Sequence, residues 1–571
     1  MRRVYRDKPA LLAVGLLLVA PIIAYSANNT PAQPRLILQI TVDQLRGDLI
    51  TRYYDRFGDG GFRYLMDQGL VYTDAHHRHA NTETIVGHAT LATGADPSIH
   101  GMVANVWLDR NTGELTYNIE DPRYPILSKD AGVDKKTEID HTQKTARSDG
   151  RSPSRILVST FSDELTLFQG GQSKVFGVSI KDRGAVSMAG HTGKAFWYSK
   201  KLSEFITSRF YYDKYPDWVK EWNEQKPGSE YAGESWQLMH DQSTYMFGES
   251  DDRPYETKLP GFGRTFPHAY GKPGDKYFTT LLTVSPAGDE MTLDFAKSLV
   301  QHEDIGKDEK TDYLSISFSS TDYVGHMFGA SSLEMEDNIL RLDRILAELF
   351  EFVDSGIGLD NTLIVFSADH GGPEAPGYLS ELGFEADYID TSTFDKAGAI
   401  KALKQRFGIG GELITTYFHP YLYLNREAIA KKGLDQEEVE LAVAAEISHF
   451  KGVALALPSI ALSKGNIADT PLSRSVLSNY NPNRSGDIYL VFEPNRFIAD
   501  FGGLVVAAAH GSPWRYDTYV PIIFAGMDIP AHKVHRRVYT TAIAPTLSLY
   551  IGAKPPTGSM DEALTEVLSR D

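Results

Sequence analysis

Aspartate and histidine side chains follow three apolar, strand-like runs of the chain. The five residues are Asp43, Asp322, His326, Asp369 and His370. The runs that precede them cover residues 36–42, 313–319 and 362–368. Ligands of open α/β sheets bind beyond the carboxyl ends of the strands, and carboxylate and imidazole groups bind divalent metal ions. The pattern therefore predicts one metal centre assembled from distant parts of the chain.

Each of these residues has a simpler explanation when it is taken alone. The i, i+4 spacing of Asp322 and His326 puts both side chains on one face of a helix, but a surface ion pair has the same spacing. Asp43 can cap a helix that starts near Leu45, and His510 can be a core histidine. Together, three aspartates and three histidines supply the ligand types that two four-coordinate zinc sites need.

A candidate nucleophile, Thr84, precedes Gly87 and His88 near the start of a predicted helix. A hydroxyl at a helix N-terminus lies in a positive field with free backbone N–H groups nearby. The alternative is an ordinary threonine N-cap. The segment therefore indicates either a nucleophile or a structural cap.

Two cations, Lys181 and Arg183, follow the predicted strand 174–180. Because strand side chains alternate between faces, the two are expected to share one face of the strand end. Arg183 can then offer a two-pronged fork to oxygen atoms and Lys181 a point charge. The alternative is a pair of solvated surface charges.

Alternating strands and helices are expected to position these residues. Predicted strands cover 36–42, 174–180, 313–319, 362–368, 487–493 and 519–524. Predicted helices lie near 60–69, 86–94, 155–168, 289–301, 332–354 and 437–450. The alternation predicts an α/β three-layer sandwich with a largely parallel central sheet. Segments 197–280 and 373–485 lack this order and are expected to be inserted cap segments that shape the site.

Composition limits the functions that the chain can have. The 571 residues carry a net charge of −18, so sequence-independent binding to nucleic acid is not expected. Hydrophobic residues make up 42% and charged residues 23%, as in an ordinary globular protein. The chain has no cysteine, so any metal site must use histidine and carboxylate, and disulfides are excluded.

The N-terminus has the pattern of an export signal. Basic residues near the start precede the apolar run 10–25, and Ala24, Tyr25 and Ser26 give a small-x-small cleavage signature. A membrane anchor is the alternative, but the run is short and contains Pro21. We expect a signal peptide at residues 1–26, a single catalytic domain at 27–571, and no stable membrane association after cleavage. The general secretory and the twin-arginine routes both remain open.

Seven motifs give the chain a resemblance to a known family. They are Thr-Val-Asp-Gln (41–44), Thr-Glu-Thr (82–84) with Gly-His (87–88), Asn-Val-Trp-Leu-Asp (105–109), Lys-Asp-Arg (181–183), Ser-Ser-Thr-Asp-Tyr-Val-Gly-His (319–326), Ala-Asp-His-Gly-Gly (368–372) and Ala-His-Gly-Ser-Pro-Trp (509–514). In these motifs, from about Leu36 to the C-terminus, the chain resembles the alkaline phosphatase superfamily and, closely, its PafA/PhoK-type periplasmic zinc phosphatases. Val86 departs from the family, which typically has proline there.

The resemblance implies residue roles and cofactors. Asp322, His326 and His510 would hold one Zn²⁺, and Asp43, Asp369 and His370 the other. Thr84 would be the nucleophile and a neighbour of the second ion, and its phosphothreonine would be the intermediate. The implied activity is hydrolysis of phosphate monoesters in the periplasm or outside the cell, with release of inorganic phosphate for scavenging. The implied partners are small-molecule phosphomonoesters, and a monomer is the expected state.

Asn105, Lys181 and Arg183 would contact the phosphoryl oxygens in this family. Such a set favours monoesters, which have two negative charges and three terminal oxygens, over diesters. A phosphodiesterase or nucleotide pyrophosphatase of the same superfamily is the alternative enzyme, although those relatives lack the Lys-x-Arg pair. A metal-binding protein without turnover is a third possibility, against which Thr84 argues. A sulfatase is disfavoured because Thr84 occupies the position of its modified cysteine or serine.

Overall fold

The computed structural model describes residues 33–569, of which residues 34–569 belong to one compact unit. The predicted signal peptide at residues 1–26 lies outside the described residues. Within the described residues, no helix has the length and apolar character needed to span a bilayer.

A nine-stranded sheet forms the centre of the fold, in the order β19-β2-β18-β11-β1-β10-β5-β6-β7. Its strands are β1 (Leu36–Val42), β2 (Leu70–His76), β5 (Val175–Ser179), β6 (Lys194–Ser199), β7 (Glu204–Ile206), β10 (Asp312–Phe318), β11 (Thr362–Ser367), β18 (Ile522–Gly526) and β19 (His532–Tyr539). The five strands from β11 to β6 are parallel to one another. Strand β18 is antiparallel to both of its neighbours, and β7 is antiparallel to β6. The largely parallel sheet was expected from the sequence.

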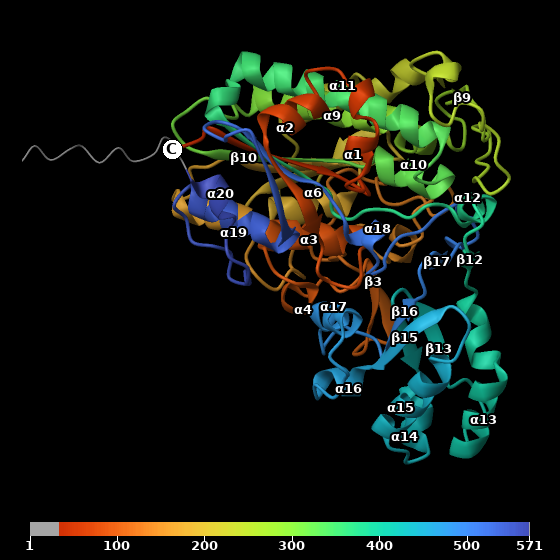
Figure 1. Ribbon diagram of the computed structural model, residues 1–571. Helices are drawn as coiled ribbons and strands as arrows, with labels where there is room; N and C mark the ends of the chain where they lie inside the picture. Colours follow the sequence, from red (N-terminus) through yellow and green to blue (C-terminus); the bar gives the residue numbers. More distant parts are fainter. Residues whose placement is uncertain (1–32, 570–571) are drawn as a thin grey trace, which may run out of the picture. The chain divides into compact units, whose positions relative to one another are not determined.

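Helices cover both faces of this sheet (Figure 1). On one side lie α2 (Phe62–Gln68), α9 (Pro286–His302), α10 (Ser320–Phe328) and α11 (Leu333–Gly356), and on the other α3 (Thr84–Thr93), α5 (Phe161–Phe168), α6 (Asp182–Ala189) and α19 (Ile543–Tyr550). Alternate residues of β1 pack against the two helix layers. Leu38 and Ile40 belong to the core under the first layer, and Ile37 belongs to the core under the second. The predicted three-layer sandwich is therefore confirmed.

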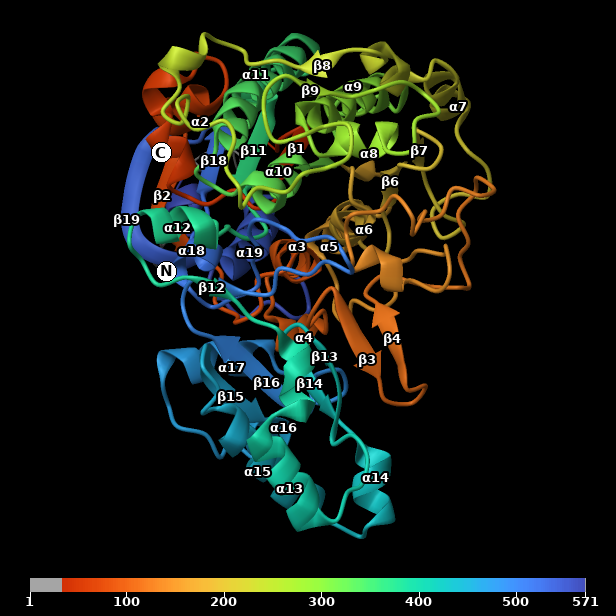
Figure 2. The same ribbon diagram turned by 90° about the vertical axis from the view of Figure 1, so that its right-hand side faces the viewer.

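A smaller lobe extends from the main body (Figure 2). It contains the antiparallel sheet β13-β14-β16-β15, formed by Ile414–Phe418, Tyr421–Leu424, Ile488–Phe492 and Val453–Pro458 in that order. Its helices include α13 (Gly398–Phe407), α14 (Arg426–Lys431) and α15 (Gln436–Ile447), which share a separate hydrophobic core with the sheet. This lobe corresponds to most of the segment that we predicted as an insertion at 373–485.

The structure corrects some expected element positions. The predicted strand 487–493 is β16, which belongs to the small sheet and not to the central one; burial on both faces gave it the apolar signal of a central strand. Residues 197–206 of the predicted insertion 197–280 lie mostly in β6 and β7 of the central sheet. The predicted helix 155–168 begins only at Phe161, because Thr160 and Asp163 form a capping box there.

Shorter elements complete the described chain. Three two-stranded pieces are β3/β4 (Val106–Asp109 and Glu114–Tyr117), β8/β9 (Ser235–Trp236 and His268–Ala269) and β12/β17 (Asp387–Tyr388 and Arg496–Phe497). Further helices are α1 (Leu49–Arg52), α4 (Pro97–His100), α7 (Asp217–Glu224), α8 (Phe278–Thr283), α12 (Pro376–Glu381), α16 (Ser459–Ser463), α17 (Pro471–Asn479), α18 (Arg515–Thr518) and α20 (Thr565–Leu568).

Candidate active site

The carboxyl ends of β10, β1 and β11 bring the predicted ligands together, because these strands are adjacent and parallel. Two groups of candidate ligand atoms result, and within each group all atoms lie within 4.8 Å of one another. The groups are Asp322 with His326 and His510, and Asp43 with Asp322 and His370. Asp322 belongs to both, so the two candidate metal positions are neighbours.

In each group, histidine nitrogens lie close to carboxylate oxygens without forming hydrogen bonds with them. Oδ1 of Asp322 lies 3.3 Å from Nε2 of His326 and 3.2 Å from Nε2 of His510. Oδ1 of Asp43 lies 3.4 Å from Nε2 of His370. Among the described residues, Oδ1 of Asp43, Oδ1 of Asp322 and Nε2 of His370 are buried and have no hydrogen-bond partner. Buried polar atoms normally find a partner, so this cluster fits bound cations.

Hydrogen bonds at Nδ1 orient the three histidine rings, so that their Nε2 atoms face the cluster. Nδ1 of His326 lies 2.8 Å from the carbonyl oxygen of Ala508, Nδ1 of His370 2.8 Å from that of Gly371, and Nδ1 of His510 2.7 Å from that of Thr82. A carbonyl oxygen can only accept, so each Nδ1 carries the proton. In a neutral ring each Nε2 then presents a lone pair to the cluster, as a metal-binding histidine requires.

Asp369, the sixth predicted ligand, lies at the edge of this arrangement. Its Oδ2 is 3.6 Å from Nε2 of His370 and 3.0 Å from Nδ1 of His88. Its Oδ1 accepts a hydrogen bond from the backbone N–H of Gln44 at 3.2 Å. Gly87 allows the main chain of Asp369 to approach helix α3, because a Cβ atom at Gly87 would meet the carbonyl oxygen of Asp369 at 1.8 Å.

Thr84 is the first residue of α3 and contacts one of the two predicted cations. Nη2 of Arg183 donates to Oγ1 of Thr84 at 3.0 Å. Oδ1 of Asn105 accepts from the N–H of Ile85 at 3.2 Å, which leaves the amide hydrogens of Asn105 for another acceptor. Val86, the departure from the family pattern, is fully buried in the hydrophobic cluster next to this helix.

Lys181 and Arg183 reach the site for a different reason from the one expected. Strand β5 ends at Ser179, Lys181 is the N-cap of α6, and Arg183 lies in its first turn, so strand alternation does not apply. The ammonium group of Lys181 lies between two carboxylates: it is 2.7 Å from Oδ2 of Asp43 and closely paired with Asp322. Burial lowers the pKa of Lys181, but these two carboxylates outweigh burial and raise it overall.

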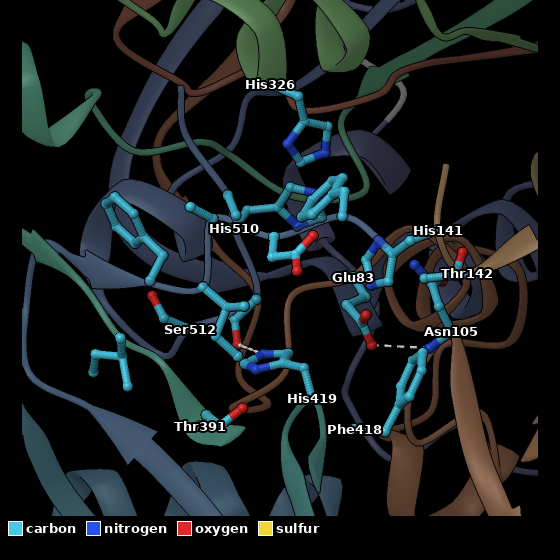
Figure 3. A pocket seen from close by; sticks show the side chains of 18 of the residues that line it. Glu83, Asn105, His141, Thr142, His326, Thr391, Phe418, His419, His510 and Ser512 are labelled. Atoms are coloured by element: carbon cyan, nitrogen blue, oxygen red, sulfur yellow. Dashed lines mark hydrogen bonds between the residues drawn. The ribbon is translucent and has the colours of Figure 1, made fainter. Parts of the chain in front are cut away.

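A cavity of about 840 Å³ opens onto the site. Figure 3 shows part of its lining, including Asn105, His141, His326, His419 and His510. Its wall is completed by the small lobe, which contributes Tyr417, Phe418 and His419. The cavity is much larger than a phosphate group, so it has room for an organic substituent.

Two contacts in this wall were not expected from the sequence. Nη1 of Arg183 donates to Oδ2 of Asp140 at 2.7 Å, and Nε2 of His419 donates to the carbonyl oxygen of Gly511 at 2.8 Å. Both residues lie in stretches without helical or strand periodicity, and no spacing relates them to their partners. Asp140 directly precedes His141, as Asp369 precedes His370, and that repeated pair is the one signal by which it could have been noticed.

Comparison with known proteins agrees with the geometry. A family model described as type I phosphodiesterase / nucleotide pyrophosphatase matches residues 37–512. The chain belongs to this family. The named relatives place this phosphodiesterase / nucleotide pyrophosphatase family member in the alkaline phosphatase superfamily, as the motifs predicted.

Similar proteins cover nearly the whole chain. It is 31% identical to alkaline phosphatase PafA of Elizabethkingia meningoseptica, over 98% of this chain and 100% of that protein. It is also 31% identical to a Myroides odoratus protein named calcium-transporting ATPase, over 96% of this chain and 97% of that one. The crystal structure of wild-type PafA has a TM-score of 0.84 and 29% identity, and the match covers 95% of this chain and 100% of that one.

Proposed function

We propose that this protein is a zinc-dependent alkaline phosphatase that hydrolyses phosphate monoesters through a phosphothreonine intermediate. The observation that carries the proposal is the position of Thr84. Its hydroxyl accepts from Arg183. Burial lowers the pKa of Arg183, but the nearby carboxylates, first of all Asp140, outweigh burial and raise it overall. Two overlapping groups of histidine and aspartate ligands lie in the same site. The full-length similarity to proteins named alkaline phosphatase supports this reading.

Six residues would hold two zinc ions. Asp322, His326 and His510 would bind one, and Asp43, Asp369 and His370 the other, with Thr84 close to the second. When bound, such ions supply Lewis acidity to the attacking and leaving oxygens of an in-line displacement. The three histidines fit this role because their Nδ1 atoms are engaged by backbone carbonyls and their Nε2 atoms face the carboxylates.

Thr84 would act in two steps. Its hydroxyl gives up its proton as Oγ attacks phosphorus, the bond to the leaving oxygen breaks, and that oxygen takes up a proton to leave as the alcohol, so that the threonine carries the phosphoryl group. Water then attacks that phosphorus, which releases inorganic phosphate and restores the hydroxyl. As the first residue of α3, the oxygen lies where the helix dipole favours negative charge.

Arg183, Lys181 and Asn105 would set the preference for monoesters. Arg183 and Lys181 are both buried, and nearby carboxylates raise the pKa of each side chain. The side-chain oxygen of Asn105 accepts from the N–H of Ile85, which leaves its amide hydrogens for a phosphoryl oxygen. A monoester brings two charges and three terminal oxygens to these donors. A diester brings one charge and a second organic substituent, so it gains less from them.

The test compares an aryl phosphate monoester with the corresponding diester. We expect a much higher kcat/KM for the monoester, with release of inorganic phosphate. Replacing Lys181 and Arg183 together by alanine should reduce monoester turnover far more than diester turnover, since losing one preorganised donor costs about 3 kcal/mol in the transition state. Equal proportional losses would reject a role in specificity.

A phosphodiesterase or nucleotide pyrophosphatase is the second candidate, favoured by the description of the matching family model. The same rate comparison decides between the two, because that activity requires the diester to be the better substrate. We also infer export to the periplasm or the medium, supported by the basic start and apolar run of the N-terminus. Fractionation of expressing cells checks this, and retention in the cytoplasm would reject it.

A further inference from the structure

Asp140 is a buried carboxylate in the cavity wall that belongs to neither group of candidate metal ligands. Its Oδ2 accepts from Nη1 of Arg183 at 2.7 Å. Its Oδ1 accepts from the backbone N–H of Thr142 at 2.9 Å and from the Thr142 hydroxyl at 2.6 Å. Both oxygens therefore have hydrogen-bond partners, and these partners fix the orientation of the carboxylate.

The segment that carries Asp140 is itself held in place from the central sheet. Oε1 of Glu138 accepts from the backbone N–H of Asp140 at 2.9 Å and from Nζ of Lys200 at 2.6 Å. Lys200 directly follows β6. A continuous series of contacts thus runs from the end of a central strand through Glu138 and Asp140 to Arg183 and Thr84.

The two ends of the Arg183 guanidinium are fixed by different partners. Nη1 donates to Asp140, whereas Nη2 donates to Thr84. Because the group is planar, two such contacts fix its plane as well as its position. Nη1 also donates to the Tyr117 hydroxyl at 3.5 Å, and Nε is buried and has no hydrogen-bond partner among residues 33–569. Because the group has five N–H donors, some of them remain for an incoming anion.

We propose that Asp140 is a positioning residue that orients Arg183 toward Thr84 and the bound phosphoryl group, and that it thereby helps to set the preference for monoesters. This inference rests on the proposed function. It explains why a carboxylate lies in a cavity that already contains several negative charges: burying another one is unfavourable unless it is paired and hydrogen-bonded. Asp140 acts through Arg183 and does not itself contact the substrate.

The test is a double-mutant cycle with Asp140→Asn and Arg183→Ala, measured on the full-length, zinc-loaded protein. Asp140→Asn keeps the shape of the side chain but removes its charge. We expect the monoester kcat/KM to fall by about tenfold to a hundredfold, the range that a small misplacement of a catalytic group produces. Diester turnover should fall less. In the Arg183→Ala background, Asp140→Asn should have almost no further effect.

Matched controls separate positioning from stability. Asp121→Asn removes a buried carboxylate from the same part of the chain, one that binds Arg123 and Ser152 and not the site, and it should leave the ratio of monoester to diester turnover unchanged. Zinc content and melting temperature are measured for every variant. Additive losses in the cycle, or equal losses for both substrates, would overturn the inference.

A second readout of the cycle does not depend on turnover. Binding of inorganic phosphate to the four proteins should weaken with Asp140→Asn only when Arg183 is present. A wild-type protein that binds phosphate but releases none from monoesters would reject the proposed function, while the binding cycle would still decide the role of Asp140. Phosphate binding that is insensitive to Asp140→Asn in both backgrounds would reject that role.

Discussion

Thr84 is the residue on which the proposed chemistry depends most directly. Thr84→Ala should abolish nearly all monoester turnover, because the attacking oxygen is removed, while zinc content stays close to that of the wild type. Thr84→Ser should keep substantial activity, since it retains the hydroxyl at the start of α3. Phosphate release and metal analysis on the same preparations check both variants. An alanine variant with near wild-type turnover would rule out a covalent threonine intermediate.

The residues of the site differ in how far the sequence predicts them. Asp43, Asp322 and Asp369 are predictable because apolar runs that are buried on both faces precede them and mark the ends of central strands. Asp140 and His419 are not predictable in this way. Their partners, Arg183 and Gly511, lie 43 and 92 residues away, and only the folded chain brings them together.

At the scale of elements, the small lobe is connected to the candidate metal site through the turn between β13 and β14. Nε2 of His419 donates to the carbonyl of Gly511, next to His510, so Nδ1 of a neutral ring must accept from the hydroxyl of Tyr417, 2.9 Å away. Gly511 has a φ of +118°, and a Cβ atom there would meet Nε2 of His419 at 2.4 Å. The lobe therefore fixes the path of the loop that carries His510.

Loss of this contact should weaken metal binding. His419→Ala is expected to lower zinc affinity or activity by about tenfold to a hundredfold, the usual effect of removing a group that supports a ligand. His419→Gln, which keeps an N–H donor, should retain part of the zinc affinity and activity that His419→Ala loses. Zinc titration of the two variants measures the effect, and His449→Ala, at an exposed position of the same lobe, serves as the control. If His419→Ala binds zinc like the wild type, the lobe does not support the ligand loop.

The elements that the sequence did not predict are mainly outer strands. Strand β19 is an edge strand with a mostly exposed, basic sequence, and such composition is typical of edges that must avoid pairing with other chains. Strand β2 carries two half-buried polar residues in its middle, which interrupt the apolar signal. Strand β16 shows the opposite problem, because complete burial in the small lobe gives the same pattern as a central strand. An apolar run in the sequence thus indicates that a strand is buried, but it does not indicate the sheet to which the strand belongs.

At the scale of the whole molecule, metal removal should affect stability as well as activity. The ligands come from segments separated by hundreds of residues, and ions that bind only to the folded chain stabilise it. We expect exhaustive chelation to inactivate the protein and to lower its melting temperature, and added zinc to restore both. Calorimetry and phosphate release on the same sample check this. Full activity after verified removal of all metal would reject the zinc assignment.

A buried carboxyl group, Glu256, should make the stability of the fold depend on pH. Burial, and then the charge of Glu334, raise the pKa of Glu256 to about 9. Below its unfolded pKa of about 4.5 both states are protonated. Between about 4.5 and about 9 only the folded state keeps the proton, so stability falls as pH rises, by an amount on the order of a few kcal/mol.

Glu256→Gln should therefore flatten this dependence. In the wild type, Glu256 accepts a hydrogen bond from the backbone N–H of Arg253 at 3.2 Å. The glutamine amide keeps an oxygen for this bond, but it cannot ionise beside Glu334. We expect the melting temperature of the wild type to fall between about pH 5 and about pH 9, and that of the variant to fall less. Thermal unfolding across this range measures both. Parallel curves for the two proteins would show that Glu256 ionises normally.

Main-chain carbonyls orient His326, His370 and His510, so the candidate metal site depends little on the side chains next to its ligands. Their oxygens belong to the main chain of Ala508, Gly371 and Thr82, and every amino acid has such an oxygen. A substitution at Ala508 or Thr82 leaves the acceptor in place, whereas at Gly371 even a Cβ atom would meet the carbonyl oxygen of Tyr516 at 2.3 Å. A change of metal preference, in evolution or in laboratory selection, would therefore require replacement of the ligands themselves or a new path for their loops. Single substitutions next to the ligands should change metal preference little.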